Sequence, residues 1–167
     1  MFSLMILAYI VDESESSVLA TSDGGVASLV EILQIRTKNS CDEVSVLSAR
    51  EILDCLNHLA INDSNKLEIE KQGGIPLIVR MLQDDFDEED QCVAAEAVWN
   101  LAFVESIRTS SQLQEAVPLL DKLRRSTNRN VRIASEMAFG SSTTTDVNTY
   151  QPEKPVHKDF RHPMKNP

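Results

Sequence analysis

The feature that most constrains this chain is an internal repeat. The segment GGVASLVEILQ at residues 24–34 aligns with GGIPLIVRMLQ at residues 73–83. The dipeptide Leu-Ala at residues 59–60 returns 42 residues later, at residues 101–102. A period of roughly 40 to 47 residues is typical of arrays in which each repeat consists of two or three helices. The chain is therefore expected to form a stack of helical repeats.

The central stretch, residues 69–103, shows how one repeat would be built. A polar helical segment ends at Gly73-Gly74, because glycine tolerates the positive φ that ends one helix and turns the chain into the next. Pro76 suits the first turn of the following helix, where its missing N–H costs nothing. That helix is apolar nearly all round, as expected for a helix buried between neighbouring repeats. The pattern predicts an all-α fold with three helices per repeat.

The motifs GGIPLIV at residues 73–79 and AVWNLA at residues 97–102 resemble the armadillo repeat family. This resemblance implies an all-α, right-handed α-solenoid of two full armadillo-like repeats with partial repeats at its ends. We expect the repeat domain over residues 1–140 and a disordered tail over residues 141–167, which holds four prolines and few aliphatic residues. The expected units are a partial repeat at 1–11, repeats at 12–61 and 62–104, and a degenerate repeat at 105–140, which lacks the glycine pair.

Several local expectations accompany this scheme. Leu67 and Ile69 should face inward from the short helix that precedes Gly73. Asn128 should cap the last helix, which should end at Gly140. Residues 37–42 and 106–111 are polar and are expected to be loops.

The first eleven residues, MFSLMILAYIV, are apolar but lack a basic n-region, precede the acidic pair Asp12-Glu13 and are too short to span a bilayer. We align Leu7-Ala8 with the later Leu-Ala pairs and expect the last helix of an incomplete repeat; a signal or anchor segment is the alternative. An incomplete repeat is expected if the chain is a piece of a longer armadillo protein. Because no earlier repeat would cover this helix, we expect self-association through it.

The charge and the cysteines limit the classes of partner. The net charge of −10 argues against nucleic acid and anionic membranes, since both select basic surfaces. It would favour basic protein or peptide partners, unless the charge serves only solubility. Cys41, Cys55 and Cys92 show no C-x-x-C spacing and are interpreted as free thiols in a reducing compartment. We expect the cytoplasm, with the nucleus as the alternative.

No arrangement of catalytic or metal-binding residues is recognisable in the sequence. His58 is the one histidine of residues 1–140, and no Ser-His-Asp pattern or phosphate-binding loop accompanies it. The acidic run at residues 84–90 has Glu89 where an EF-hand loop needs glycine. We interpret the run as carboxylates that stabilise the N-terminus of the next helix. We therefore expect neither an enzyme nor a metal ion or other cofactor.

The third helix of each repeat holds the candidate binding residues. In armadillo arrays these helices line a concave groove, and an asparagine one residue before Leu-Ala binds the backbone of an extended peptide. The resemblance assigns this role to Asn100. Trp99 is expected to pack against the neighbouring repeat. The predicted peptide-binding residues are Glu51, Asp54, His58, Glu96, Asn100 and Glu136.

Two interpretations of the acidic residues remain open: an ordinary solvated helix face, or a groove for basic peptides. The function implied by the resemblance is a non-enzymatic scaffold that binds extended peptide segments of partner proteins. The alternative is a structural or oligomerising segment of a larger protein with no ligand of its own.

Overall fold

The computed structural model describes residues 24–38 and 47–143. Within these two ranges the chain forms helices and turns and no β-strand. The predicted partial repeat at residues 1–11, the uncapped helix, Cys41 and residues 144–167 of the predicted tail lie outside the described residues.

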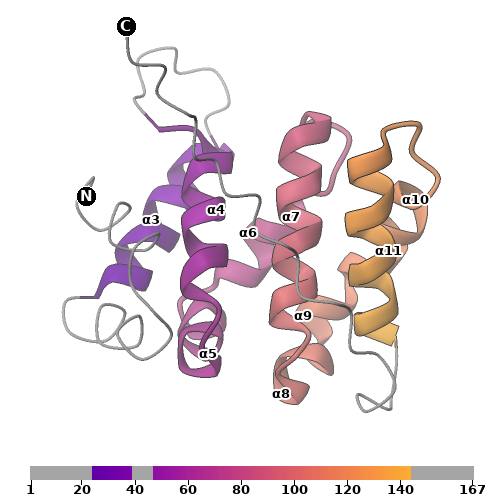
Figure 1. Ribbon diagram of the computed structural model, residues 1–167. Helices are drawn as coiled ribbons and strands as arrows, with labels where there is room; N and C mark the ends of the chain where they lie inside the picture. The colour runs from indigo at the N-terminus through magenta and orange to yellow at the C-terminus, as the bar shows by residue number, and fades with distance from the viewer. Residues whose placement is uncertain (1–23, 39–46, 144–167) are drawn as a thin grey trace, which may run out of the picture.

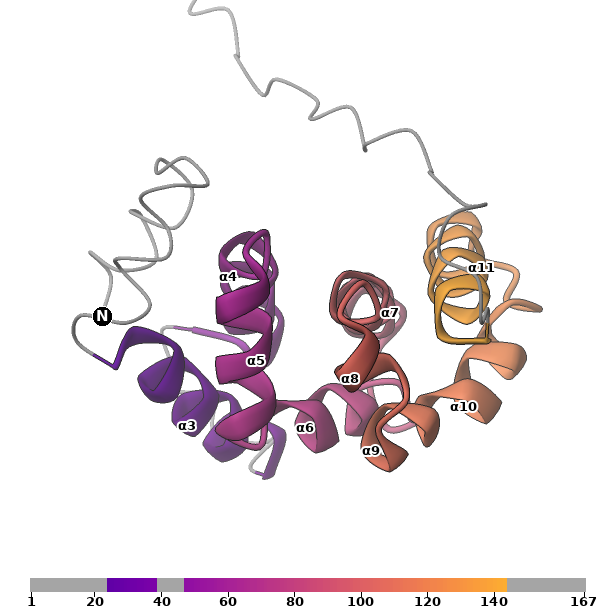
Figure 2. The same ribbon diagram turned by 90° about the horizontal axis from the view of Figure 1, so that it is seen from below.

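The helices fall into three consecutive groups (Figure 1). Seen along the helices, α4, α7 and α11 lie side by side on the inner side of an arc, and α3, α6, α9 and α10 lie on its outer side (Figure 2). The predicted all-α solenoid is confirmed. The helices are α3 (Gly25–Lys38) and α4 (Ala49–Leu59); α5 (Asp63–Lys71), α6 (Gly74–Arg80) and α7 (Glu88–Leu101); and α8 (Glu105–Arg108), α9 (Ser111–Gln114), α10 (Ala116–Leu123) and α11 (Arg129–Thr143).

The glycine pair between α5 and α6 forms the predicted tight bend. Gly73 has a φ of +77°, in the left-handed region that side chains disfavour. A Cβ atom on Gly74 would lie 2.7 Å from the Cγ2 atom of Ile69 and 3.0 Å from its carbonyl oxygen. The first glycine is therefore required for the turn, and the second for the close approach of α6 to α5.

The apolar stripes pack into one core that continues from α3 to α11. Ile75, Ile78 and Leu82 are almost completely buried, as predicted for a helix between neighbouring repeats. The prediction for α5 was half wrong, because Ile69 is buried whereas Leu67 is 44% exposed. Successive residues of a helix are about 100° apart, so the phase set by Ile69 turns Leu67 away from the core.

Three predicted boundaries need correction. Residues 37 and 38 belong to α3 and not to a loop; the buried Thr37 hydroxyl donates a hydrogen bond to the Leu33 carbonyl at 2.9 Å. The predicted loop at 106–111 contains most of α8 and the start of α9, so the third group also begins with a short helix. The last helix continues past Gly140 to Thr143, with Ser142 buried. In each case tertiary burial extends helical structure into polar sequence.

Polar side chains hold the ends of the third helices. Asn65 Nδ2 donates to the Leu59 carbonyl at 2.6 Å, and Arg108 Nη1 donates to the Ala102 carbonyl at 3.1 Å. The two donors stand six residues after their acceptors, so successive repeats close the third helix in the same way. At the start of α11, Asn128 Oδ1 accepts from the Asn130 N–H at 2.9 Å, which confirms the predicted cap.

The acidic run before α7 acts as predicted at a helix N-terminus. The Asp87 carboxylate accepts from the Asp90 N–H at 2.8 Å, and residues 88–90 form the first turn of α7. The run also joins neighbouring groups: Lys122 on α10 bonds Asp84 at 2.7 Å, and Arg50 on α4 forms an ion pair with Glu89. The run therefore links the start of α7 to both neighbouring groups through exposed ion pairs, each of which adds only about 0–1 kcal/mol.

Candidate functional site

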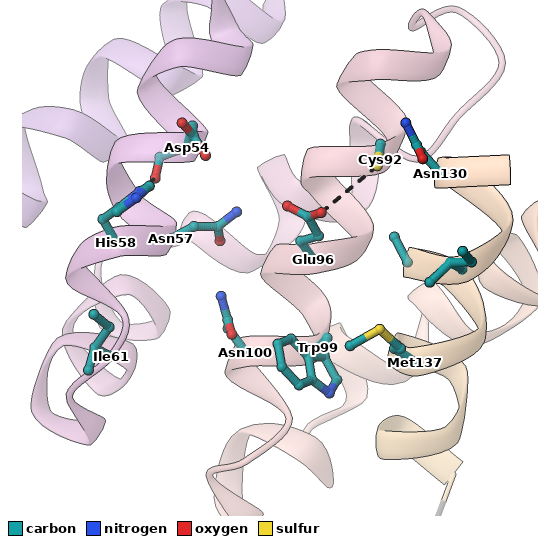
Figure 3. A pocket seen from close by; sticks show the side chains of 12 residues that line it. Asp54, Asn57, His58, Ile61, Cys92, Glu96, Trp99, Asn100, Asn130 and Met137 are labelled. Carbon is teal, nitrogen blue, oxygen red and sulfur yellow. Dashed lines mark hydrogen bonds between the residues drawn. The ribbon is translucent and has the colours of Figure 1, made fainter. Parts of the chain in front are cut away.

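A groove of about 560 Å³ lies along α4, α7 and α11 (Figure 3). Its volume falls within the range of about 300–1,000 Å³ found for ligand-binding clefts. The lining residues are Asp54, Asn57, His58 and Ile61 from α4 and its end; Cys92, Glu96, Trp99 and Asn100 from α7; and Asn130, Ile133, Ala134 and Met137 from α11.

Helical spacing explains the α4 wall of the groove. Asp54, His58 and Ile61 stand at i, i+4 and i+7, which places them on one face, while the buried residues of α4 occupy the other. Nδ1 of His58 lies 2.8 Å from the Asp54 carbonyl oxygen, which holds the ring against its own helix. Asn57 Nδ2 donates to the Val93 carbonyl at 3.3 Å and so bridges α4 to α7.

The α7 wall has two sides. Glu96 and Asn100 are one turn apart, whereas Cys92 and Trp99 are turned toward α11 (Figure 3). The Trp99 ring meets the Phe103 ring edge-on, with centroids 5.3 Å apart and planes at 72°. Trp99 is only partly buried and lines the groove. That Trp99 matters more for packing than for binding stays a prediction: the ring packs against Phe103 on one side and borders the groove on the other.

The groove shifts the acidity of two of its side chains. Partial burial raises the pKa of Glu96, and the nearby Asp54 carboxylate raises this pKa further, whereas His58 acts in the opposite direction. Burial, with a smaller contribution from the Glu96 charge, raises the pKa of the Cys92 thiol to about 11. Cys92 is thus almost entirely protonated at neutral pH, which makes it a poor nucleophile.

Four of the six predicted binding residues meet in this groove: Asp54, His58, Glu96 and Asn100. Glu51 serves the start of α4 instead. Its carboxylate accepts from the Ser48 N–H at 2.8 Å and the Ser48 hydroxyl at 2.9 Å, in a capping box that lowers the pKa of Glu51.

Glu136 is exposed on α11 but is not part of the groove lining. The lining positions of α11 are residues 130, 133, 134 and 137, a spacing of i, i+3, i+4 and i+7. Glu136 stands one position before Met137 and therefore points about 100° away from it.

Sequence reasoning missed the other lining residues, among them Asn57, Asn130 and Met137. The 42-residue period relates Asn57 to Trp99, as it relates His58 to Asn100. Assigning Trp99 to the groove would therefore have identified Asn57 as well. The α11 residues gave a weaker signal. Their phase follows from which side chains of α11 are buried, and the large apolar residues of this helix, Val131, Ile133, Met137 and Phe139, spread over more than half of its circumference.

The described residues include no group of three or more His, Cys, Asp or Glu side chains placed to hold a metal ion. None of the helices in the two described ranges combines the length and the apolar character needed to cross a membrane.

Comparison with known proteins identifies the repeat. Residues 62–103 match the model of the Armadillo/beta-catenin-like repeat. A designed armadillo repeat protein has a similar structure, with a TM-score of 0.67 and 21% identity over 83% of this chain and 55% of the designed one. An engineered protein of known crystal structure also matches, with a TM-score of 0.67 and 24% identity over 83% of this chain and 53% of the engineered one.

This chain thus spans about half the length of these two structures. No curated protein matches it in sequence. The predicted armadillo-type repeat and its solenoid fold are confirmed.

Proposed function

We propose that this armadillo-type solenoid is a protein-interaction scaffold that binds an extended peptide segment of a partner along α4, α7 and α11. Armadillo repeats generally serve as protein-binding scaffolds. The observation that carries the proposal is the presence of an amide side chain on each helix of the groove, at Asn57, Asn100 and Asn130. An amide has both donors and an acceptor, so Asn100 and Asn130 can each pair with the N–H and the C=O of a peptide backbone, whereas Asn57, which already donates to the Val93 carbonyl, would contribute chiefly its carbonyl oxygen.

The shape of the groove favours an extended segment. Packed helices lie about 8–10 Å apart, so three of them present a surface about 20 Å wide. An extended chain rises about 3.3 Å per residue, and about six residues would therefore cross it. The groove is lined by residues of all three helices, so a chain that crosses them would contact each helix in turn.

The charge of the groove favours basic side chains on that segment. Asp54 and Glu96 line it, and Lys and Arg are absent from its lining residues. Each partly exposed ion pair would add only about 0.2–1 kcal/mol. Because charges separated by more than about 8 Å are screened at physiological salt, we expect weak binding that weakens further as salt increases.

Titration with two synthetic peptides tests this proposal, one rich in Lys and Arg and one neutral, both designed to be extended. Trp99 is the single tryptophan of the chain and lines the groove, so its emission reports occupancy by peptides that lack tryptophan. Both peptides should bind at low salt, the basic one more tightly.

Asn100→Ala should weaken both peptides by about five- to tenfold, the effect of losing one or two hydrogen bonds. Gln72→Ala is the matched control, because Gln72 is an exposed amide on the surface of the same repeat. If neither peptide binds the unchanged protein, the proposal fails, and the structural segment without a ligand becomes the better description.

A further inference from the structure

We infer that the groove selects a segment in which basic and large apolar side chains alternate. This inference rests on the proposed function and specifies the ligand that the same groove would hold. It arises from an unequal distribution of side chains between the two ends of the groove helices.

The first end is acidic on α4 and α7, whereas α11 contributes Asn130 and Ile133 there. We call Asp54 and Glu96 the acidic rim; both lie nearer the starts of α4 and α7 than the other rim does (Figure 3). These are the two carboxylates among the residues that line the groove. A Lys or Arg side chain directed toward this rim would meet opposite charge.

The second end is apolar. We call Ile61, Trp99 and Met137 the apolar rim; Ile61 follows the end of α4, Trp99 lies near the end of α7, and Met137 of α11 lies beside Trp99 (Figure 3). Ile61 is 53% exposed, and beyond Trp99 the adjoining Phe103 is 42% exposed. Seven residues separate Asp54 from Ile61, which corresponds to about 10 Å along a helix axis. An apolar side chain of a partner could cover this surface.

The amides of α4 and α7 lie one turn beyond the acidic rim. Asn57 stands three residues after Asp54 and four before Ile61, and Asn100 stands four residues after Glu96, beside Trp99, with Phe103 three residues beyond it. In an extended chain the N–H and C=O groups lie in one plane, and successive side chains point to opposite faces of it. A backbone that pairs with these amides and crosses the helices would direct its side chains to the acidic and the apolar rim in turn.

The two rims would contribute differently to binding. Covering apolar surface contributes more than an exposed ion pair, so the apolar positions should supply most of the affinity. The basic positions should set the register and the dependence on salt. A partner segment with the same residues in two separate blocks could satisfy only one rim over most of its length.

Three eight-residue peptides with glycine–serine flanks test the pattern: Lys alternating with Leu, the same residues as four Lys followed by four Leu, and Lys alternating with Ser. Emission of Trp99 reports binding. The alternating Lys/Leu peptide should bind about tenfold more tightly than the block peptide. Equal affinity of these two peptides would overturn the inference while leaving the proposed function standing. Silence toward all three, and toward a neutral extended peptide, would overturn both.

Variants of each rim make the test reciprocal. Ile61→Ser should weaken the Lys/Leu peptide about three- to tenfold and leave the Lys/Ser peptide unchanged, because only the apolar contact is lost. The double variant Asp54→Asn, Glu96→Gln should remove most of the salt dependence and leave an alternating Leu/Ser peptide unchanged. Ile35→Ser and Glu31→Gln are the matched controls, since both residues are exposed on α3, outside the groove. Equal weakening of every peptide by both rim variants would contradict two separate rims.

Discussion

The three groove helices form two junctions, α4 with α7 and α7 with α11, and these junctions differ in how closely the helices pack. The contact between α7 and α11 is more extensive than the contact between α4 and α7. Small buried side chains characterise the junction of α7 with α11, including Ala95 on α7 and Ala134 and Ala138 on α11. Polar groups bridge the junction of α4 with α7: the Asn57 amide donates to the Val93 carbonyl, and Arg50 forms an ion pair with Glu89.

This difference shows that similar repeats can pack closely or less closely. We call the closely packed contact of α7 with α11 the sealed junction and the looser contact of α4 with α7 the open junction. Small side chains allow two helices to approach closely, because the distance between packed helices depends on the side chains at the contact. At the other junction, longer polar side chains span the distance between α4 and α7. The acidic residues of the groove, Asp54 and Glu96, come from the two helices of this open junction.

The largest expected effect comes from enlarging a small side chain in the sealed junction. Ala95 shares the α11 side of α7 with Cys92 and Trp99, at i−3 and i+4, and is completely buried. Ala95→Leu should lower the free energy of unfolding by about 1–3 kcal/mol, because the close approach leaves no room for the added atoms.

Ala97→Leu is the comparison variant. Ala97 shares the α4 side of α7 with Val93 and Asn100, at i−4 and i+3, and is 2% exposed. The more open junction should accommodate leucine at a smaller loss of stability. Urea unfolding of both variants measures the two losses. An equal or larger loss at Ala97 would show that the two junctions are equally tight.

A somewhat smaller effect is expected at the tryptophan. Trp99→Ala should lower the free energy of unfolding by about 2 kcal/mol, less than the about 3–5 kcal/mol of a wholly buried aromatic, because part of the ring borders the groove. Thermal unfolding followed by circular dichroism measures the change. Phe103→Ala is the control, since it removes the edge-on ring contact from a more exposed position. A loss at Trp99 no larger than that at Phe103 would show that the ring adds little to the sealed junction.

The open junction should respond to pH through Glu96. Its pKa in the folded chain is raised from the ordinary value of 4.5, chiefly by burial and then by the Asp54 charge. The folded chain therefore holds this proton more tightly than the unfolded chain does, so ionisation of Glu96 destabilises the fold above the raised pKa. Glu96→Gln should raise the melting temperature at pH 7, and the gain should shrink as pH falls toward 4.5.

Glu31→Gln, on the outer helix α3, is the control for this pH dependence. A gain from Glu96→Gln that is the same at pH 7 and pH 4.5 would contradict the electrostatic origin of the effect.

The smallest effect concerns the thiol between the two junctions. With a pKa of about 11, Cys92 should react slowly with a disulfide reagent at pH 8 in a chain that carries Cys41→Ser and Cys55→Ser. Adding Glu96→Gln should speed the reaction a few-fold, because the Glu96 charge is the second cause of the raised pKa. The absorbance of the released thiolate measures the rate. A rate that Glu96→Gln leaves unchanged would assign the protection of Cys92 to burial alone.

Local rules were enough to predict the repeat, the bend at its glycine pair and the N-terminal ends of α7 and α11. The period of the Leu-Ala pairs, the glycine pair at residues 73–74 and the acidic run before α7 each act through residues close in sequence. The resemblance assigned Asn100 to the inner face, and Glu96 could then be placed beside it, since a position one turn away lies on the same side of a helix.

Tertiary packing decided which side chains meet. The rotation of α11 about its axis depends on its small buried residues fitting against α7, and that rotation brings Met137 into the groove and leaves Glu136 outside. The capping role of Glu51 was instead a local signal that the sequence analysis missed, since Ser48 and Glu51 have the spacing of a capping box at the start of α4. The side chains of α4, α7 and α11 are about 40 residues apart in sequence, and only the distances between the packed helices determine which of them share a groove.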